Sequence, residues 1–372
     1  MYVTRLSYEQ YRNLSDGTIS PEKGIHVIYG ENAQGKTNLL EALWLFTGGH
    51  SFRGAKDREI PKIDTATGRN MPFCRLELDF YSEGRQQNAK LMIQDGKRSS
   101  IINGVSKKSG TPLVGKVCAV IFSPEHLQLV KGNASLRRGF IDGAICQIRP
   151  GYAKILSTYK KILMQRNTLL KDIAREPSLL DTMDIWDMRM AKYGADVIKQ
   201  RFFYVDRLQP IVTGAYSGIS GNREEISIEY APCINVGEEN KEALLLEALH
   251  RERESDLRRG YTASGPHRDD MQIKINGMSA RLFASQGQQR SAVLSMKLAE
   301  AQILYEDTAE SPIILLDDVM SELDAGRQDY LLNNLHDTQV FITCCAPEAV
   351  RLMEQGKKFF VDSGRVIYQS VL

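Results

Sequence analysis

The stretch Gly30-Glu31-Asn32-Ala33-Gln34-Gly35-Lys36-Thr37 (GENAQGKT) decides the fold of this chain. It follows an apolar run, residues 25–29, and precedes residues 38–46, whose apolar side chains recur at helical spacing. Strand, glycine-containing turn and helix in this order are the context of a phosphate-binding loop. The two glycines permit a tight turn whose amides face one anion, and the helix adds its unpaired N–H groups and dipole.

The motif assigns a role to each fixed position. Lys36 reaches the terminal phosphates and is a candidate catalytic residue, and the Thr37 hydroxyl is a candidate ligand of Mg²⁺. The alternative is a chance match in an ordinary turn, but all fixed positions and both flanks favour the functional interpretation. We therefore predict a nucleoside triphosphate ligand. The predicted binding residues of the loop are Gly30, Glu31, Asn32, Ala33, Gln34, Gly35, Lys36 and Thr37.

Length and composition restrict the class of protein. The chain has 372 residues, which suits about two domains, and its 42% hydrophobic and 25% charged residues are typical of a globular protein. The start, Met1–Arg5, lacks the plan of a signal peptide, and no apolar run has the length of a membrane span. The six cysteines show no regular spacing. We expect a cytoplasmic protein with reduced thiols and no membrane partner.

Charge is distributed unevenly along the chain. The net charge is +2, yet the segment from Lys131 to Lys171 carries nine cations and a single acid, Asp142. Such a basic segment suggests a polyanionic partner, above all nucleic acid. The alternative is a solvated helical surface balanced in space by the acidic run Glu238–Glu254. The candidate DNA-binding residues are Arg137, Arg138, Lys160 and Lys161.

Periodicity along the chain predicts an α/β protein with a helical insertion. Residues 136–212 have helical spacing, residues 214–222 suggest a loop, and residues 239–256 suggest a charged helix. We predict an ATPase-type head of residues 1–122 and 258–372, and an inserted, mainly helical domain of residues 123–257. The strands of the first block are expected to form one mixed sheet. Strands are predicted at residues 2–9, 73–82, 89–94, 99–105, 117–122, 225–230, 271–275 and 340–343, with a final hairpin at 359–368.

A second acidic motif complements the glycine loop. Residues 312–318 form an apolar run that ends in Asp317 and Asp318, as expected for a strand buried on both faces of a parallel sheet. Ligands bind at the carboxyl ends of such strands, so Asp317 is predicted to hold Mg²⁺ together with Thr37. Asp318 is the candidate for positioning or activating the attacking water. The alternative is a pair of solvated turn residues, but the upstream glycine loop favours the catalytic interpretation.

The stretch Ser285-Gln286-Gly287-Gln288-Gln289-Arg290 opens a long amphipathic helix. Ser285 is suited to cap that helix, and Gly287 permits close approach of the backbone. A capped helix terminus with a hydroxyl group is a potential second anion site, although an ordinary N-capped helix explains the same residues.

These motifs together resemble the ABC-type ATPase head. SQGQQR looks like its signature motif, and SELD at residues 321–324 looks like its D-loop. The segments YRNL (11–14), SPEHLQLVKG (123–132) and SGPHRDD (264–270), with the helical insertion, are similar to the bacterial RecF recombination-mediator family, whose members are relatives of SMC-type ATPases. The resemblance covers essentially the whole chain.

The resemblance implies a function and further site residues. ATP would join two protomers, with Ser285 and Gly287 contacting the γ-phosphate bound at Lys36 of the partner subunit, and Arg12 and Asn13 contacting the nucleotide. It implies ATP-dependent binding of single-stranded, gapped or duplex DNA in replication, repair and recombination, and loading of recombinase together with RecO and RecR. The expected enzyme is a weak ATPase that converts ATP and water to ADP and phosphate as a switch.

Two departures from the ABC pattern predict slow hydrolysis. Asp318 stands where such ATPases usually carry Glu, which is one methylene longer, and Cys344-Cys345 follows the next strand where a switch histidine is expected. His267, in a turn-rich loop, is predicted to be structural rather than catalytic. Two alternatives remain: an ABC-type ATPase coupled to a partner such as a membrane permease, and a scaffold that binds ATP without cleaving it.

Overall fold

The computed structural model describes residues 1–107, 113–234, 240–335, 337–345 and 356–371. The chain forms two compact units. The first unit comprises Met1–Leu127, Ala215–Asn222 and Arg290–Leu372, and the second comprises Gln128–Gly214 and Arg223–Gln289. The helices α5 (Met183–Ser220) and α8 (Gln286–Thr308) contribute residues to both units.

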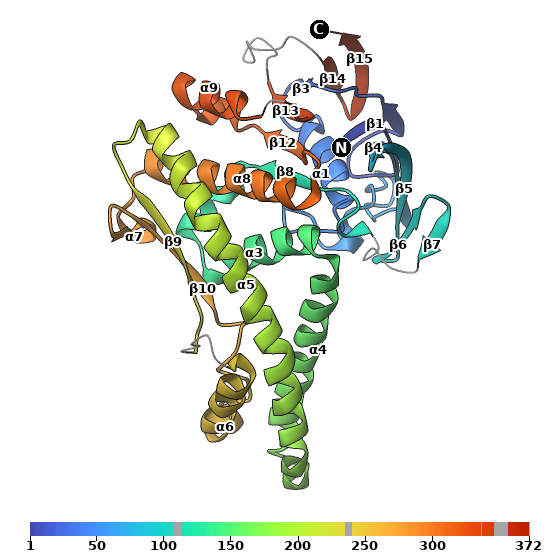
Figure 1. Cartoon of the computed structure of the whole chain (residues 1–372). Helices are drawn as coiled ribbons and strands as arrows, with labels where there is room; N and C mark the ends of the chain where they lie inside the picture. Colours follow the sequence, from blue (N-terminus) through green and yellow to red (C-terminus); the bar gives the residue numbers. More distant parts are fainter. Residues whose placement is uncertain (108–112, 235–239, 336, 346–355, 372) are drawn as a thin grey trace. The chain divides into compact units, whose positions relative to one another are not determined.

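The first unit contains an antiparallel sheet of six strands in the order β2-β1-β4-β5-β6-β7 (Figure 1). Its strands alternate buried and exposed side chains, as in β4, because one face packs on the core. The strands are β1 (Tyr2–Glu9), β2 (Gly17–Ile19), β4 (Phe73–Ser82), β5 (Arg85–Gln94), β6 (Lys97–Ile102) and β7 (Val105–Lys107).

A second sheet in the same unit has the order β15-β14-β3-β13-β12-β8. Five of its strands run parallel and only β15 is antiparallel to its neighbour, so the carboxyl ends of β8, β12, β13, β3 and β14 share one edge. All residues of β12 and β13 are buried, which explains their apolar runs. The strands are β3 (Ile25–Tyr29), β8 (Ala119–Phe122), β12 (Ile313–Asp317), β13 (Val340–Cys344), β14 (Lys357–Asp362) and β15 (Arg365–Val371).

Helix α1 (Lys36–Leu45) is the central helix of the first unit. Leu39, Leu40 and Leu43 are buried in one hydrophobic core with residues of both sheets. Only the glycine loop separates β3 from α1. The N-terminal end of this buried helix therefore lies at the carboxyl edge of the parallel sheet (Figure 1). Among the described residues, the unit also contains α9 (Ala325–Asn333) and the short 3-10 helices η1 (Asp57–Glu59), η3 (Pro124–Leu127) and η5 (Met320–Glu322).

The second unit combines helices with a small antiparallel sheet in the order β11-β10-β9. Its strands are β9 (Ile226–Ala231), β10 (Asp270–Ile275) and β11 (Met278–Ser279). Its complete helices are α2 (Gln128–Lys131), α3 (Ala134–Ile148), α4 (Pro150–Asp172), η4 (Pro177–Thr182), α6 (Lys241–Arg259) and α7 (Ala280–Phe283).

Most predicted strands and the helical character of the middle segment are confirmed, but three details are wrong. The strand predicted at residues 99–105 is divided into β6 and β7, because Asn103 and Gly104 form a left-handed turn between them. The strands of the first block belong to two sheets, because β3 and β8 pair with β13 and β12. The loop predicted at residues 214–222 is helical as far as Ser220, because the burial of Val212 and Tyr216 one turn apart outweighs the low helix propensity of glycine. The predicted domain boundaries stay a proposal; the compact second unit extends to Gln289.

Candidate nucleotide-binding site

The glycine loop between β3 and α1 has an unusual backbone conformation. Gly30, Ala33 and Gly35 have φ values of 148°, 66° and 115°, in the left-handed region that disfavours side chains. A Cβ on Gly30 would collide with the carbonyl oxygen of Val361. A Cβ on Gly35 would lie 2.6 Å from Cδ2 of Leu14. Both glycines are therefore required by packing as well as by backbone conformation.

Lys36 is folded under this loop. Its side chain is 4% exposed, and Nζ donates hydrogen bonds to the carbonyl oxygens of Gly30 (2.6 Å) and Glu31 (3.0 Å). The ammonium group is thus already held beside the start of α1, where the helix dipole favours an anion. This arrangement suits a phosphate group.

Thr37 and Asp317 meet at the carboxyl edge of the parallel sheet. The Thr37 hydroxyl donates to Oδ1 of Asp317 at 2.8 Å, and the Thr343 hydroxyl donates to the same oxygen at 2.9 Å. Burial raises the pKa of Asp317 above its ordinary value; the two hydroxyl groups oppose this, and the nearby charges of Asp318 and Glu125 add to it. A hydroxyl and a carboxylate in a region of excess negative charge are a donor set that fits Mg²⁺.

Asp318 leaves the strand in a left-handed conformation. Its φ is 52°, its backbone N–H donates to the Thr343 hydroxyl at 2.9 Å, and its carbonyl oxygen accepts from the Ser321 hydroxyl at 2.8 Å. A non-glycine residue in this region costs roughly 1–3 kcal/mol, so the surrounding hydrogen bonds must fix it. The backbone of the half-buried Asp318 is therefore held at a defined position after Asp317, and the role of its carboxylate toward water stays a prediction.

Arg12 is anchored to α1 and η1, whereas Asn13 is anchored to the glycine loop. Nε and Nη2 of Arg12 each donate to the buried carboxylate of Glu41 at 2.7 Å, and Nη1 donates to the carbonyl oxygen of Glu59. These contacts use three of the five N–H donors of Arg12, and its predicted contact with nucleotide stays a prediction. Asn13 donates to the carbonyl oxygen of Ala33 at 3.0 Å, so it lies against the loop itself.

Ser285 caps α8 as predicted. Its hydroxyl accepts from the backbone N–H of Gln288 at 3.3 Å, and the Gln288 side chain accepts from the Ser285 N–H at 2.8 Å. This reciprocal exchange is a capping box. The exposed Ser285 and the neighbouring Gly287 lie in the second unit, and their contact with a nucleotide on a second protomer stays a prediction.

Two neighbours of the site were missed by sequence reasoning. Cys345, the residue after β13, lies with Sγ 3.8 Å from Nζ of Lys36 and donates to Oδ1 of Asn32 at 3.3 Å. Glu125 follows β8 and contributes to the raised pKa of Asp317. The available signal was topological: Cys345 comes directly after β13 and Glu125 three residues after β8, and both strands end at the same edge of the sheet.

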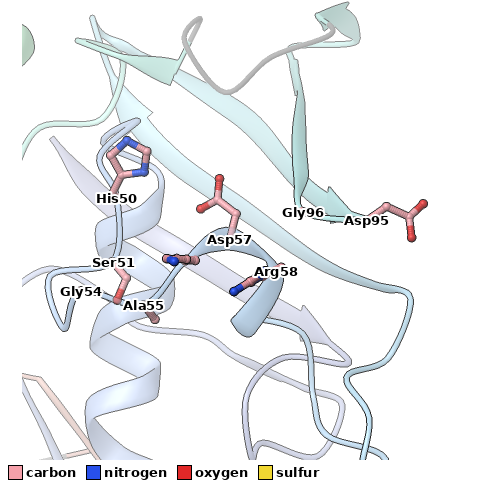
Figure 2. A pocket seen from close by; sticks show the side chains of 9 residues that line it. His50, Ser51, Gly54, Ala55, Asp57, Arg58, Asp95 and Gly96 are labelled. Atoms are coloured by element: carbon pink, nitrogen blue, oxygen red, sulfur yellow. The ribbon is translucent and has the colours of Figure 1, made fainter. Parts of the chain in front are cut away.

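A surface hollow lies beside the C-terminal end of α1 (Figure 2). The Ser51 hydroxyl donates to the buried Glu41, and Nη2 of Arg98 donates to Asp57 at 2.6 Å. The lining is therefore cross-linked by polar contacts, and it contains no residue that the sequence predicted for the nucleotide site. The lining residues are His50, Ser51, Gly54, Ala55, Lys56, Asp57, Arg58, Asp95 and Gly96.

The basic segment of the second unit is partly neutralised in space. Arg137 is 4% exposed and pairs with Asp270 at 2.6 Å, and Arg138 donates to the carbonyl oxygen of Asp269 at 2.7 Å. Lys160 and Lys161 are exposed on α4. The prediction that Arg137 faces DNA is therefore wrong, because a carboxylate more than a hundred residues away pairs with it. The predicted DNA contacts of Arg138, Lys160 and Lys161 stay predictions.

Arg166, another cation of the basic segment, is also neutralised by carboxylates, in the interior of the second unit. Its side chain is fully buried and pairs with Asp187 and Asp256, each at 2.7 Å. The run proposed as an acidic counterweight also contributes Arg253, which bonds to Asp187 at 2.6 Å. Glu242, Glu247 and Glu254 of the run are exposed. Glu238 and Glu239 of that run lie outside the described residues.

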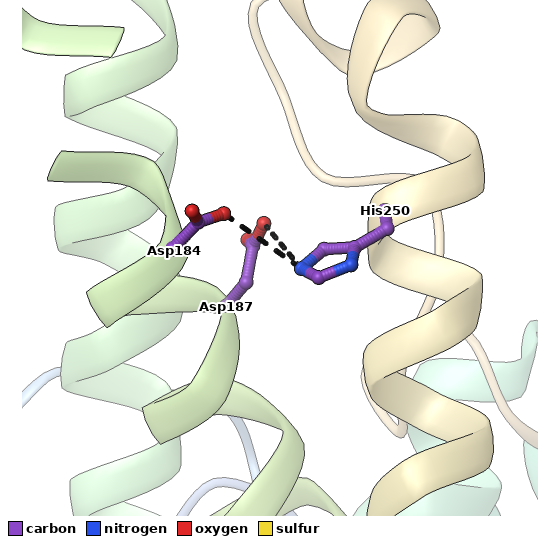
Figure 3. Close-up of side chains that lie close together, drawn as sticks. All are labelled: Asp184, Asp187 and His250. Atoms are coloured by element: carbon purple, nitrogen blue, oxygen red, sulfur yellow. Dashed lines mark ion pairs between the residues drawn. The ribbon is translucent and has the colours of Figure 1, made fainter. Parts of the chain in front are cut away.

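Asp184, Asp187 and His250 lie close enough together to suggest a metal site (Figure 3). Nε2 of His250 is 3.8 Å from Asp184 and 3.9 Å from Asp187. However, Arg253 donates to both carboxylates, and Arg166 also bonds to Asp187. Two arginines already supply the positive charge, so we interpret the group as an ion-pair network.

His267 has a structural role in the second unit. Its Nε2 bonds to the carbonyl oxygen of Thr262 at 3.0 Å and must donate, so Nδ1 accepts from the Tyr159 hydroxyl at 2.7 Å. Burial lowers the pKa of His267 to about 4. The ring is therefore neutral near pH 7 and serves as a link between α4 and its loop.

The fold and the site define a class of protein: a P-loop nucleotide-binding protein whose buried acid follows a parallel strand, as in SMC-type heads. A family model, RecF/RecN/SMC N terminal domain, matches residues 2–367. The DNA replication and repair proteins RecF of Acetivibrio thermocellus and Ruminiclostridium cellulolyticum are each 39% identical to this chain, over 99% of it and 100% and 99% of their own lengths. The chain belongs to the RecF family of DNA replication and repair proteins.

Solved structures agree with this assignment. A structure described as the recombination mediator protein RecF with ATP in the RecFOR pathway has a TM-score of 0.89 at 36% identity, covering 100% of this chain and 97% of its own. The Smc head domain of Pyrococcus furiosus has a TM-score of 0.56 at 14% identity, covering 100% and 96%. The latter shows a shared fold alone. Within the described residues, no helix is both long and apolar enough to cross a bilayer.

Proposed function

We propose that this chain is an ATP-dependent DNA-binding protein of recombinational repair and replication-fork maintenance. The observation that carries the proposal is the contact of Thr37 with the buried Asp317, 2.8 Å apart, next to a loop that already holds Lys36. The RecF relatives support it, since one of them is described with ATP and as part of the RecFOR pathway. RecO, RecR and DNA are the partners that we propose for this chain.

The residues divide the work of a slow ATPase. Thr37 and Asp317 would hold Mg²⁺, which supplies neutralisation of charge between the phosphates. Lys36 would turn from the carbonyl oxygens of Gly30 and Glu31 toward the terminal phosphate. Asp318 would orient the attacking water from its fixed position. Its side chain is shorter than Glu, so we expect the conversion of ATP and water to ADP and phosphate to be slow enough for a switch.

ATP would also gate a homodimer. Ser285 is exposed at the capped start of α8, where the helix dipole favours an anion. We propose that Ser285 and Gly287 contact the γ-phosphate bound to a second copy. Dimer formation would then depend on ATP, and the dimer would be the form that binds DNA and acts with RecO and RecR in loading recombinase.

Sedimentation with and without ATP tests the gate. The wild type is expected to dimerise only with ATP, and Ser285→Arg to bind ATP but to remain monomeric. Gln165→Arg, an equal change at an exposed position of α4, serves as the control and should dimerise like the wild type. Dimers of Ser285→Arg at the wild-type level would reject the proposed contact.

Single-turnover hydrolysis tests the enzyme. We expect a slow rate in the wild type and a rate lower by at least tenfold in Asp318→Asn, with ATP affinity retained. Equal and near-zero rates in both proteins would instead support a scaffold that binds ATP without cleaving it.

A further inference from the structure

The turn between β14 and β15 ends at the same edge of the sheet as the P-loop. β14 runs parallel to β3, with Phe360 opposite Tyr29, so the chain after β14 emerges beside the loop that follows β3. The reversal uses two left-handed residues, Ser363 at φ 49° and Gly364 at φ 75°. The turn is more than three hundred residues from the P-loop in sequence but adjacent to it in the fold.

This turn makes two hydrogen bonds to a single P-loop residue. The Gly364 N–H donates to the carbonyl oxygen of Gln34 at 3.1 Å, and the Ser363 N–H donates to Oε1 of Gln34 at 2.5 Å. The Gly364 carbonyl in turn accepts from the Ser15 N–H at 2.8 Å. The backbone of one tight turn therefore orients both the backbone carbonyl group and the side-chain carbonyl group of Gln34.

The segment after β1 holds the same part of the loop. Asn13 donates to the carbonyl oxygen of Ala33 at 3.0 Å and accepts from the side chain of Asn38 at 2.6 Å. A Cβ on Gly364 would collide with the carbonyl oxygen of Asn13. Ala33 and Gln34 are thus held between the segment that contains Asn13 and the Ser363-Gly364 turn. These two segments can approach each other closely because residue 364 is glycine.

We propose that the Ser363-Gly364 turn is a brace that positions the P-loop for phosphate, with Gly364 and Ser363 as positioning residues. A P-loop binds well only if its amides converge on one anion, and a loop that must first be ordered binds more weakly. The brace fixes the strained loop before any ligand arrives. This inference rests on the proposed function, in which the P-loop binds ATP.

A matched pair of glycine substitutions separates the brace from general strain. Gly364→Ala and Gly104→Ala both place a side chain at a left-handed φ, 75° and 82°, but a Cβ on Gly104 meets open space. Both variants should lose thermal stability through the strained φ, and Gly364→Ala should lose more, because its Cβ also collides with the carbonyl oxygen of Asn13. Only Gly364→Ala should weaken ATP binding, by at least tenfold, while single-turnover hydrolysis at saturating ATP stays within about twofold of the wild type.

Amide hydrogen exchange supplies a readout that does not depend on activity. Without nucleotide, amides of residues 30–37 should exchange faster in Gly364→Ala than in the wild type or in Gly104→Ala. If Gly364→Ala does not fold, Gln34→Ala removes the Ser363 contact. Because Gln34 is itself a predicted nucleotide-binding residue, the readout for this variant is exchange without nucleotide, and residues 30–37 should exchange faster than in the wild type.

Lys36→Ala distinguishes failure of the brace from failure of the proposed function. If Lys36→Ala binds ATP like the wild type, the P-loop is not the ATP site. If Lys36→Ala loses binding while Gly364→Ala keeps both wild-type affinity and wild-type exchange, or Gln34→Ala in its place keeps wild-type exchange, the brace is rejected.

Discussion

The P-loop corner and the basic helical segment are both rich in charge, but they use it differently. In the first, one lysine and one buried aspartate stand ready for a ligand, and their described hydrogen bonds are to carbonyl groups, hydroxyl groups and the Cys345 thiol. In the second, Arg137 and Arg166 are each paired with carboxylates of the same unit. A charge satisfied by neutral dipoles can accept a ligand, whereas a charge satisfied by a counter-ion mainly supports the fold.

Arg166 should give the largest effect if this contrast is correct. Arg166→Ala leaves Asp187 and Asp256 buried without their partner and should lower the free energy of unfolding by about 3–5 kcal/mol. Lys160→Ala, on the exposed face of the same helix, should change it by less than about 0.5 kcal/mol. Urea denaturation of both variants measures the difference, and equal small effects would show that the buried ion pairs are not structural.

Substitution of Lys36, in contrast to that of Arg166, should affect ATP binding rather than stability. Lys36→Ala removes a group that reaches phosphate but pairs with no carboxylate in the structure, so the fold should tolerate it. We expect ATP affinity to fall at least a hundredfold, about 2.7 kcal/mol or more. Lys97→Ala, at an exposed position of β6, is the control. Calorimetric titration with ATP is the measurement, and normal affinity of Lys36→Ala would remove the assignment.

The exposed lysines of α4 sharpen the comparison for DNA. Replacing Lys160 and Lys161 together by Glu should weaken DNA binding about tenfold for all sequences and reduce the salt dependence of the affinity, because each lysine would otherwise displace counter-ions. Arg85→Glu with Lys97→Glu makes the same charge change on the first unit. Fluorescence anisotropy across a salt series is suitable. Identical curves for both double variants would remove α4 from the DNA surface.

Substitution of Asp317 should give the smallest effect, and it should raise rather than lower the stability of the nucleotide-free protein. Burial raises its pKa, so ionised Asp317 costs stability, and this cost is relieved as the pH falls through the raised pKa. Asp317→Asn keeps an acceptor for Thr37 and Thr343 and should stabilise the nucleotide-free protein by about 1 kcal/mol at pH 7. The gain should shrink as the pH falls. Thermal denaturation between pH 4.5 and 7.5 measures it; destabilisation at pH 7 would contradict the account.

The parts of the site that are formed by consecutive residues could be predicted from the sequence. The P-loop, its flanking strand and helix, and the apolar strand before Asp317 were all predictable, because local periodicity and strand polarity place them at one edge. Contacts between distant segments were not predictable. Nothing local indicates that Arg137 meets Asp270, that Gly364 bonds to Gln34, or that Cys345 lies beside Lys36. These depend on strand order and side-chain packing, which a single sequence does not reveal.

The central claim is that Thr37 and Asp317 hold the metal that accompanies the triphosphate. Titration of ATP into the wild type and into Asp317→Asn, each with and without Mg²⁺, tests it most directly. We predict that Mg²⁺ tightens ATP binding to the wild type at least tenfold and leaves the affinity of Asp317→Asn nearly unchanged, while both proteins bind metal-free ATP alike. The same Mg²⁺-dependent gain in Asp317→Asn would contradict the account.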